Sequence, residues 1–292
     1  MQGGAWAAVA LLIWAGWFGV TRAGVRGTLG IADVAALRLG IGALLLLPGF
    51  LRGAARIPRR GWAEGVVLSA AWGAPFVLLL GRGVQLTSAA YAAGLVPSTM
   101  PVFAGLLAWI FRRERPTPRR LAGYGVIVAA VLVLALVVPG PRNAWADLLL
   151  MGASLSWAVY TLRVGRSGLS PAQAAALTCI YSAAVFLPVY WVWGLSGLAS
   201  VPVRELVVQG VYQGVLAGAG AILAFTRAVA LLGPASASAV TSLVPVVATM
   251  LAVPLAGEWP GPLELSADVA IGAGVWLATQ ASAGSLSGRR AP

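Results

Sequence analysis

The sequence predicts an all-α membrane protein, with ten transmembrane helices arranged as two inverted five-helix repeats around a central cavity. Three observations predict this architecture. The chain of 292 residues is 60% apolar and only 10% charged, whereas a soluble protein of this length needs far more charge on its surface. Long apolar runs follow one another with short connections. The stretch that begins at Pro101 returns 144 residues later at Pro245, and internal repeats in apolar chains are typical of transporters.

Each predicted helix is an apolar run of about 20 residues, the length that crosses the hydrocarbon core of a bilayer. The ten helices divide into an N-terminal repeat at 1–140 and a C-terminal repeat at 141–292. Because each repeat has an odd number of helices, the second enters the membrane from the opposite side. In chain order, the predicted helices span roughly 3–21, 32–51, 62–81, 84–111, 119–139, 144–163, 171–193, 205–226, 234–257 and 262–282.

The repeat itself consists of a proline inside an apolar run and a glutamate thirteen residues later. The first copy has Pro101 and Glu114, and the second has Pro245 and Glu258. Each glutamate ends a predicted helix, where a charge is readily solvated, so we interpret both glutamates as structural anchors.

The distribution of arginine predicts the orientation, because cytoplasmic loops carry an excess of positive charge. All twenty basic residues are arginine. A cytoplasmic N-terminus puts fourteen of them in inner loops and five in outer loops. The sequence therefore predicts a protein of the cell inner (plasma) membrane with both termini in the cytoplasm. The remaining arginine, Arg38, lies within a predicted helix; such a residue is a functional candidate, but at this depth we expect its side chain to snorkel to the outer interface.

Composition also excludes several classes of protein. The chain has no histidine and one cysteine, Cys179, which excludes a disulfide framework and an ordinary zinc site. We expect no metal, no cofactor and no enzymatic activity, because no nucleophile–base pair or carboxylate cluster is evident. The arginines that give the chain its net charge of +12 lie between apolar spans rather than on a polar surface. We therefore do not expect nucleic acid as a binding partner. The expected partners are a small-molecule substrate and the lipid bilayer; the sequence does not fix an oligomeric state.

Prolines inside predicted helices form the first set of candidate site residues. A proline has no amide proton, so a carbonyl one turn earlier loses its helical partner. In a membrane that carbonyl must find protein, water or substrate. We predict hinges at these prolines and a substrate site among neighbouring hydroxyls; the alternative is that the hydroxyls only satisfy the kinks. The predicted hinges are Pro97, Pro101 and Pro245, and the hydroxyl residues are Ser98, Thr99, Thr241 and Ser242.

Aromatic residues form the second set. Rings that face a cavity stack on flat apolar solutes and on cations. The alternatives are ordinary helix packing, or a belt of rings at the membrane interface, which we expect for Trp191 and Trp193 at a helix end. We predict that rings farther from the helix ends, and rings that share a helix face with them, bind the substrate. These residues are Trp14, Trp17, Trp72, Tyr91, Trp157 and Tyr160, together with the amide of Gln213.

These features resemble the drug/metabolite transporter superfamily, in its ten-helix EamA type. The resemblance is carried by the repeated proline–glutamate stretch, by Arg38, and by the pair Thr87-Ser88 in the opening turns of the fourth predicted helix. With its twelve tryptophans, the chain resembles YddG-like aromatic amino-acid exporters most among the EamA-type exporters. The resemblance implies a cavity lined mainly by predicted helices 1, 3, 4, 6, 8 and 9, with helices 5 and 10 at the periphery.

The resulting functional prediction is a transporter that exports small organic solutes, with aromatic or other hydrophobic amino acids as the leading class. Export would proceed by alternating access at a midplane cavity. One alternative is an exporter of multiple drugs, quaternary cations or other metabolites within the same superfamily. The first predicted helix has no acidic residue, which is evidence against proton-driven cation exchange. An alternative from another class is a non-transporting membrane scaffold.

Overall fold

The computed structural model describes residues 2–137, 143–241, 243–256 and 261–280. Over these ranges the chain is helical and has no β-strand, so the predicted all-α class is confirmed. Seven helical segments in this part of the chain are long and apolar enough to cross a membrane. These segments are Gln2–Val25, Ile31–Arg56, Arg59–Leu86, Ala89–Arg112, Pro118–Val137, Pro171–Val192 and Val203–Gly233.

The described elements follow one another with short connections, as the sequence predicts. Those before residue 138 are α1 (Gln2–Arg26), α2 (Ile31–Gly53), the 3₁₀ turn η1 (Ala54–Arg56), α3 (Arg59–Trp72), α4 (Ala74–Leu86), α5 (Ala89–Arg112) and α6 (Pro118–Val137). Those after it are α7 (Ala144–Val164), α8 (Pro171–Val192), the 3₁₀ turn η2 (Leu198–Ser200), α9 (Val203–Gln209), the π-helical segment η3 (Gly210–Gly220), α10 (Ala221–Thr241), α11 (Val244–Ala256) and α12 (Pro262–Gln280).

The third predicted helix, 62–81, differs from the structure in length and continuity. The helical segment runs from α3 through α4 and is interrupted at Gly73. A Cβ on Gly73 would lie 1.7 Å from Ser182 Oγ, so only glycine allows this approach to α8. Pro75 lies in the first turn of α4, where its missing amide proton breaks no helical hydrogen bond. The break sets Trp72, the last residue of α3, beside Phe76 of α4.

The ninth predicted helix, 234–257, is also corrected. The helical path of α10 is broken at Gly233, which has a non-helical φ of 80°, so the predicted start at 234 coincides with a break. The predicted continuity to 257 is wrong, because α10 ends at Thr241 and α11 begins at Val244. Pro245 is therefore the second residue of α11 rather than a residue in the middle of a helix. The first turn of a helix tolerates proline because its amide would have no intrahelical acceptor, a position that an uninterrupted apolar run does not reveal.

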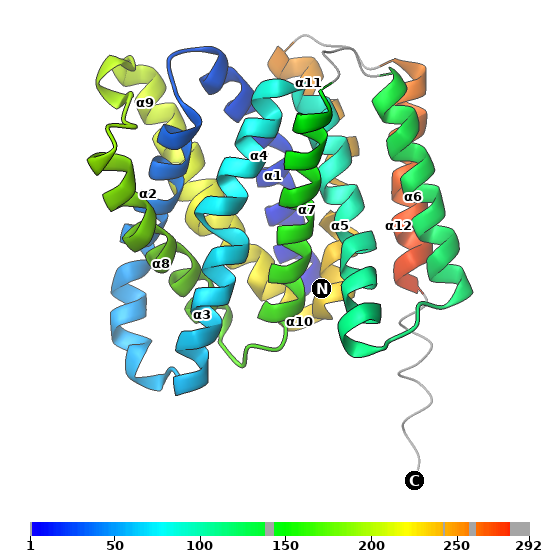
Figure 1. Cartoon of the computed structure of the whole chain (residues 1–292), viewed down its shortest axis with the longest axis horizontal. Helices are drawn as coiled ribbons and strands as arrows, with labels where there is room; N and C mark the ends of the chain where they lie inside the picture. The colour runs from blue at the N-terminus through cyan, green and yellow to red at the C-terminus, as the bar shows by residue number, and fades with distance from the viewer. Residues whose placement is uncertain (1, 138–142, 242, 257–260, 281–292) are drawn as a thin grey trace.

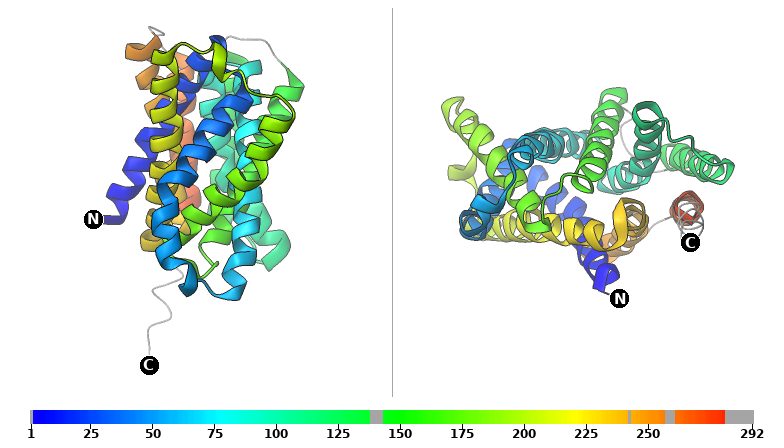
Figure 2. Two further views of the ribbon diagram at one scale, coloured as in Figure 1. Left: turned by 90° about the vertical axis from the view of Figure 1, so that its left-hand side faces the viewer. Right: turned by 90° about the horizontal axis from the view of Figure 1, so that it is seen from below.

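Helices α6 and α12 form a pair at one edge of the molecule (Figures 1 and 2). This is the peripheral position that the resemblance implies for predicted helices 5 and 10. Their backbones approach closely, because a Cβ on Gly123 would lie 2.6 Å from the Gly274 carbonyl oxygen. Small residues at such crossings are typical of helix packing in membranes. Elsewhere α2 packs against α8 and η3, α1 against α10, and α5 against α7.

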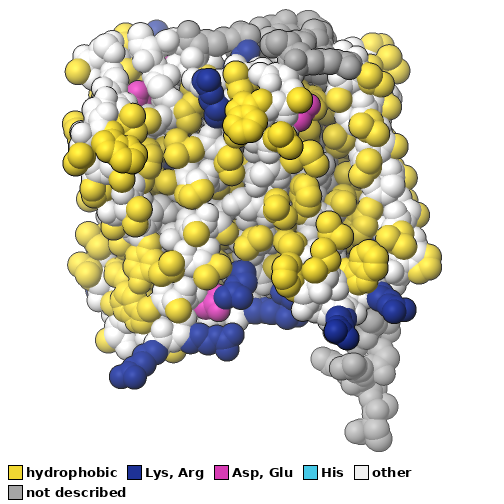
Figure 3. Space-filling model, in the orientation of Figure 1, with side chains coloured by type: hydrophobic (Ala, Val, Ile, Leu, Met, Phe, Trp, Pro, Cys, Tyr) yellow, Lys and Arg dark blue, Asp and Glu magenta, His cyan; other side chains and the backbone are white. Residues whose placement is uncertain are grey.

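The surface fits a lipid environment. Many large apolar side chains are exposed, among them Leu44, Phe111, Leu136 and Val185. Figure 3 shows apolar side chains over the height of the visible face and most of its arginine side chains at one end. That end holds the α2–α3 and α5–α6 connections (Figure 1), so the arginine asymmetry of the sequence is also an asymmetry of the structure.

The α6–α12 crossing generates a first prediction. Replacing Gly123→Val inserts a branched side chain against the α12 backbone, so we expect the free energy of unfolding to fall by about 1–3 kcal/mol, the usual effect of overpacking. Thermal unfolding of the purified protein in detergent measures the shift in Tm. The matched control is Gly125→Val in the same helix, because a Cβ there meets nothing within 4 Å. Equal Tm shifts for the two variants would contradict a close crossing at Gly123.

Candidate functional site

A cluster of aromatic rings occupies the interior of the bundle. Trp14 of α1 lies 5.7 Å from Trp72 and 5.0 Å from Trp157, measured between ring centroids. Trp72 stacks on Phe76 at 4.2 Å with an interplanar angle of 12°. Phe225 of α10 lies 5.1 Å from Trp14. Tilted and edge-to-face arrangements at these distances are the favourable ones for aromatic pairs, so the rings stabilise one another while drawing five helices together.

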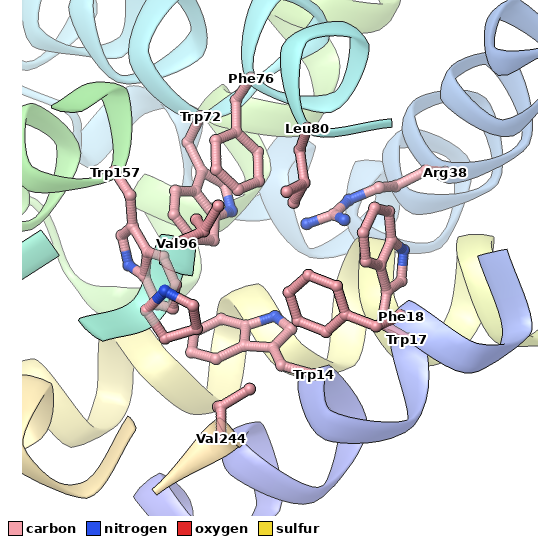
Figure 4. A pocket seen from close by; sticks show the side chains of 11 residues that line it. Trp14, Trp17, Phe18, Arg38, Trp72, Phe76, Leu80, Val96, Trp157 and Val244 are labelled. Atoms are coloured by element: carbon pink, nitrogen blue, oxygen red, sulfur yellow. The ribbon is translucent and has the colours of Figure 1, made fainter. Parts of the chain in front are cut away.

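The cluster borders a small cavity, drawn in Figure 4. The volume that the centre of a water-sized sphere can occupy in this cavity is about 20 Å³. One water molecule needs about 10–15 Å³ of such volume. The room inside the cavity is therefore too small for anything much larger than water in this conformation. Its lining comes from α1, α2, α3, α4, α5, α7 and α11, and consists of Trp14, Trp17, Phe18, Arg38, Trp72, Phe76, Leu80, Val96, Pro97, Trp157 and Val244.

Arg38 lies in this lining, which corrects the expectation that it snorkels to the outer interface. Its residue surface is 1% exposed, and its guanidinium reaches into the cavity between Leu80 and Trp17 (Figure 4). The guanidinium carbon lies 5.7 Å from the Trp17 ring centroid and 5.9 Å from that of Phe76. These rings provide a cation–π environment that sequence spacing alone does not reveal.

A buried hydrogen-bond network fixes the orientation of Trp17. Its Nε1 donates to Gln213 Oε1 at 2.6 Å. Gln213 Nε2 in turn donates to Thr21 Oγ1 at 2.9 Å and to Gln209 Oε1 at 3.1 Å. Gln213 lies in η3, so this predicted site residue acts behind the tryptophan ring rather than in the cavity lining.

The predicted hydroxyls of α5 lie beside the cavity but are directed at the helix backbone. Ser98 Oγ donates to the Gly94 carbonyl. Thr99 Oγ1 lies 2.8 Å from both the Leu95 carbonyl oxygen and Ser154 Oγ. Their hydrogen bonds thus join α5 to itself and to α7, which is the packing alternative considered for them. Pro97, between these residues and the rings, lines the cavity.

The other predicted residues have different surroundings. Tyr160 stacks behind Trp72, with ring centroids 5.0 Å apart. Tyr91 donates a hydrogen bond to Asp147 Oδ1 at 2.8 Å and is not in the cavity lining. Thr241 ends α10, but its side chain and all of Ser242 lie outside the described structure. Val244, the first residue of α11, lines the cavity two residues further on.

A second cavity lies among α5, α6, α7 and α12. The volume that the centre of a water-sized sphere can occupy there is about 300 Å³. Pro101 lines it, one turn along α5 from Pro97 of the first cavity. Its charged lining residues are Arg112, Glu114, Arg120 and Arg166. Glu114 Oε1 lies 3.6 Å from Arg166 Nη2, an ion pair between the segments that follow α5 and α7. Glu258 lies outside the described residues.

The acidic residues with described side chains are engaged away from the aromatic cavity. Glu64 forms a two-point ion pair with Arg163, with N–O distances of 2.9 and 3.1 Å. Asp33 accepts hydrogen bonds from Tyr190 and from two backbone amides. Asp268 accepts one from Thr249 at 2.8 Å. Among the described residues, none of the acids lines the aromatic cavity.

Sequence reasoning missed four aromatic or cationic contributors. Phe76 follows Trp72 by four residues and Phe18 follows Trp14 by four, a spacing that places rings on one helix face; this signal was available. Arg38 was visible as the single arginine inside an apolar run, but its inward direction depends on the packing of α2. Phe225 carries no signal of its own in the sequence.

A bundle of apolar helices around an interior cavity is typical of membrane transport proteins, and comparison with known proteins specifies the family. The model of the EamA-like transporter family matches residues 1–136 and 144–280, so the chain belongs to that family and is a multi-pass membrane transporter. It is 30% identical over 297 aligned positions to a probable terminal-alkyne amino-acid exporter of Streptantibioticus cattleyicolor, covering 98% of both chains. A solved crystal structure resembles the fold with a TM-score of 0.68 at 20% identity, covering 96% of this chain and 97% of the other.

The network behind Trp17 generates a second prediction. Gln213→Leu removes the acceptor of the buried indole N–H and the donor to Thr21. An unsatisfied buried polar group costs about 1–3 kcal/mol, so we expect a clearly lower Tm in detergent. The control is Gln85→Leu, whose side chain is half-buried and accepts a hydrogen bond from exposed Arg82. If both variants unfold at the same temperature, the network does not hold Trp17 in place.

Proposed function

We propose that this protein exports small hydrophobic amino acids, aromatic ones foremost, across the cell inner (plasma) membrane. Membership of the EamA-like family and the likeness to an amino-acid exporter support amino acids as the substrate class. The observation that carries the proposal is the small interior cavity lined by Trp14, Trp17, Trp72 and Trp157. Flat, polarisable rings suit a flat or linear apolar side chain.

The proposal includes an architecture of ten transmembrane helices in two inverted halves, 1–140 and 141–292. The two segments that match the family model, 1–136 and 144–280, correspond to these halves. Packing gives further support, because helices at equivalent places in the two halves pack against each other. These pairs are α2 with α8, α5 with α11, and α6 with α12.

Transport in this scheme proceeds by alternating access. The aromatic cavity has room for about one water, so an amino acid can enter only after the surrounding helices separate. Rocking of one half against the other opens the cavity to each side in turn. Pro97 and Pro101 are the proposed hinges of α5, and Pro245 is the proposed hinge at the break between α10 and α11, beside Thr241 and Ser242.

Roles for the remaining candidate residues follow from their surroundings. The four tryptophans of the lining would stack on the substrate side chain. Tyr160 and Gln213 would hold Trp72 and Trp17 in place. Ser98 and Thr99 would keep the proline-bent part of α5 packed, and Tyr91 would tie α5 to α7.

The quaternary-cation alternative has less support. A cation exporter needs a carboxylate near its substrate, whereas the charged group in the described lining is the guanidinium of Arg38. A scaffold protein, in turn, has no need of an interior cavity lined by aromatic rings. Binding of a solute to the purified protein separates a transporter from a scaffold.

The proposed orientation is tested by cysteine accessibility. In a Cys179→Ala background, Ala55→Cys in η1 should react with a membrane-impermeant maleimide only in inverted vesicles. Ala199→Cys in η2 should react only in intact cells. Both positions are exposed and lie at opposite ends of the bundle (Figure 1), and positive loops stay inside. Labelling of Ala55→Cys in intact cells would reverse the orientation.

The proposed site is tested by transport. We expect Trp157→Ala to lower recognition of L-tryptophan and L-phenylalanine several-fold in reconstituted vesicles, since one lost ring–ring contact is worth about 1 kcal/mol. The matched control is Trp191→Ala, because that ring is 65% exposed whereas Trp157 is 3% exposed. Equal losses at both positions would contradict binding at the aromatic cavity. Transport of tetraphenylphosphonium but of no amino acid would favour the cation alternative.

A further inference from the structure

The aromatic cavity contains a buried positive charge without a counter-charge in the described structure. Arg38 Nε and Nη2 are buried and have no hydrogen-bond partner among the described residues. None of the ion pairs in that part of the chain includes Arg38. A buried charge without a partner costs several kcal/mol. The rings of Trp17 and Phe76 offset part of this cost, but a ring face does not replace an oxygen acceptor.

Among the residues described in the cavity lining, the buried side-chain atoms without a hydrogen-bond partner are donors: the two guanidinium nitrogens and the indole Nε1 atoms of Trp14, Trp72 and Trp157. The hydroxyl of Tyr160, which could also accept, is without a partner among the described residues too, but it lies behind Trp72 and outside the lining. No carboxylate of the described residues lines the cavity. A site that offers a guanidinium and indole N–H groups, and no anionic acceptor, fits a ligand that brings oxygen acceptors and negative charge.

From this arrangement we propose that Arg38 binds the carboxylate of the exported solute, so that the transporter selects hydrophobic solutes that carry a carboxylate. The proposal rests on the proposed function and specifies its substrate chemistry. Guanidinium and carboxylate form paired, charge-assisted hydrogen bonds, which would satisfy the buried donors at the moment the solute is bound. A single cation matches the single charge of a carboxylate better than the two charges of a phosphate monoester.

The position of Arg38 would also determine the orientation of the bound substrate. The guanidinium enters from α2, beside Trp17 and Leu80, whereas Trp14, Trp72 and Trp157 gather on the other side of the cavity (Figure 4). A carboxylate held at Arg38 therefore directs the apolar side chain of the same molecule towards the three tryptophans. The ring of Trp17, held by its bond to Gln213, lies 5.7 Å from the guanidinium carbon. One charged contact and one aromatic contact would together define a hydrophobic amino acid or a hydrophobic carboxylic acid.

The test compares three radiolabelled probes with one ring: L-phenylalanine, 3-phenylpropionate, which lacks the amine, and L-phenylalaninamide, which lacks the carboxylate. Binding to the purified full-length protein is measured by scintillation proximity. The wild type should bind the amide about tenfold or more weakly than phenylalanine. Arg38→Met should weaken binding of both carboxylates about tenfold or more and leave the amide within about twofold. Arg38→Lys, which keeps the charge but loses the planar fork, should show an intermediate preference.

The matched control is Arg82→Met, the same chemical change at an exposed arginine of α4, which should leave all three affinities unchanged. Monodispersity on size exclusion reports folding, and Arg38→Lys carries the comparison if Arg38→Met is not monodisperse. Wild-type protein that binds the amide as well as phenylalanine, or variants that lose all probes equally, would overturn the role of Arg38. Arg38-dependent binding of 3-phenylpropionate without any amino acid would keep that role and overturn the amino-acid function.

Discussion

A constraint of the lipid environment shapes this structure: backbone polar groups inside a membrane must be satisfied within the protein. A helix can therefore be interrupted only where neighbours replace the lost bonds. The described interruptions include Gly73 between α3 and α4, the π-helical segment η3, the kink at Gly233, and the interval between the end of α10 at Thr241 and the start of α11 at Val244. Residues at three of them adjoin the aromatic cavity: Trp72 and Phe76 flank the first, Gln213 of η3 binds Trp17, and Val244 lines the cavity itself. Irregular backbone thus lies beside the candidate site at three places.

Composition and periodicity predicted the all-helical class, most helix positions, and the four tryptophans that line the cavity. Two kinds of information were out of reach. The first is helix continuity: nothing in an apolar run shows that Gly73 lies against Ser182 of a helix more than a hundred residues away, or that Pro245 opens a helix. The second is the direction of side chains. Arg38 enters the cavity and Ser98 donates a hydrogen bond to its own helix. Both directions depend on how α2 and α5 pack, which cannot be read from the sequence alone.

The proposed halves share an arrangement of helices but differ in the polar side chains at matching positions. Pro48 of α2 and Pro188 of α8 occupy matching places in two helices that pack together. Ten residues before each proline stand Arg38 and Thr178. Arg38 presents unpartnered donors to the cavity, whereas Thr178 Oγ1 donates to the Ala174 carbonyl of its own helix at 2.8 Å. A repeat of helices can thus give a nearly symmetric frame for movement, while a single side chain from one copy gives the central cavity its charge and its polarity.

The closed aromatic cluster has a consequence for the membrane as well as for the solute. A transporter in an energised membrane can leak protons and ions, because these follow any continuous file of water through the protein. The cavity admits about one water, and the rings around it pack at centroid distances of 4.2 to 5.7 Å. The buried guanidinium adds an electrostatic barrier to small cations at the same level. In this conformation the tryptophans proposed to hold the solute thus leave little room for such a file of water at the aromatic cavity.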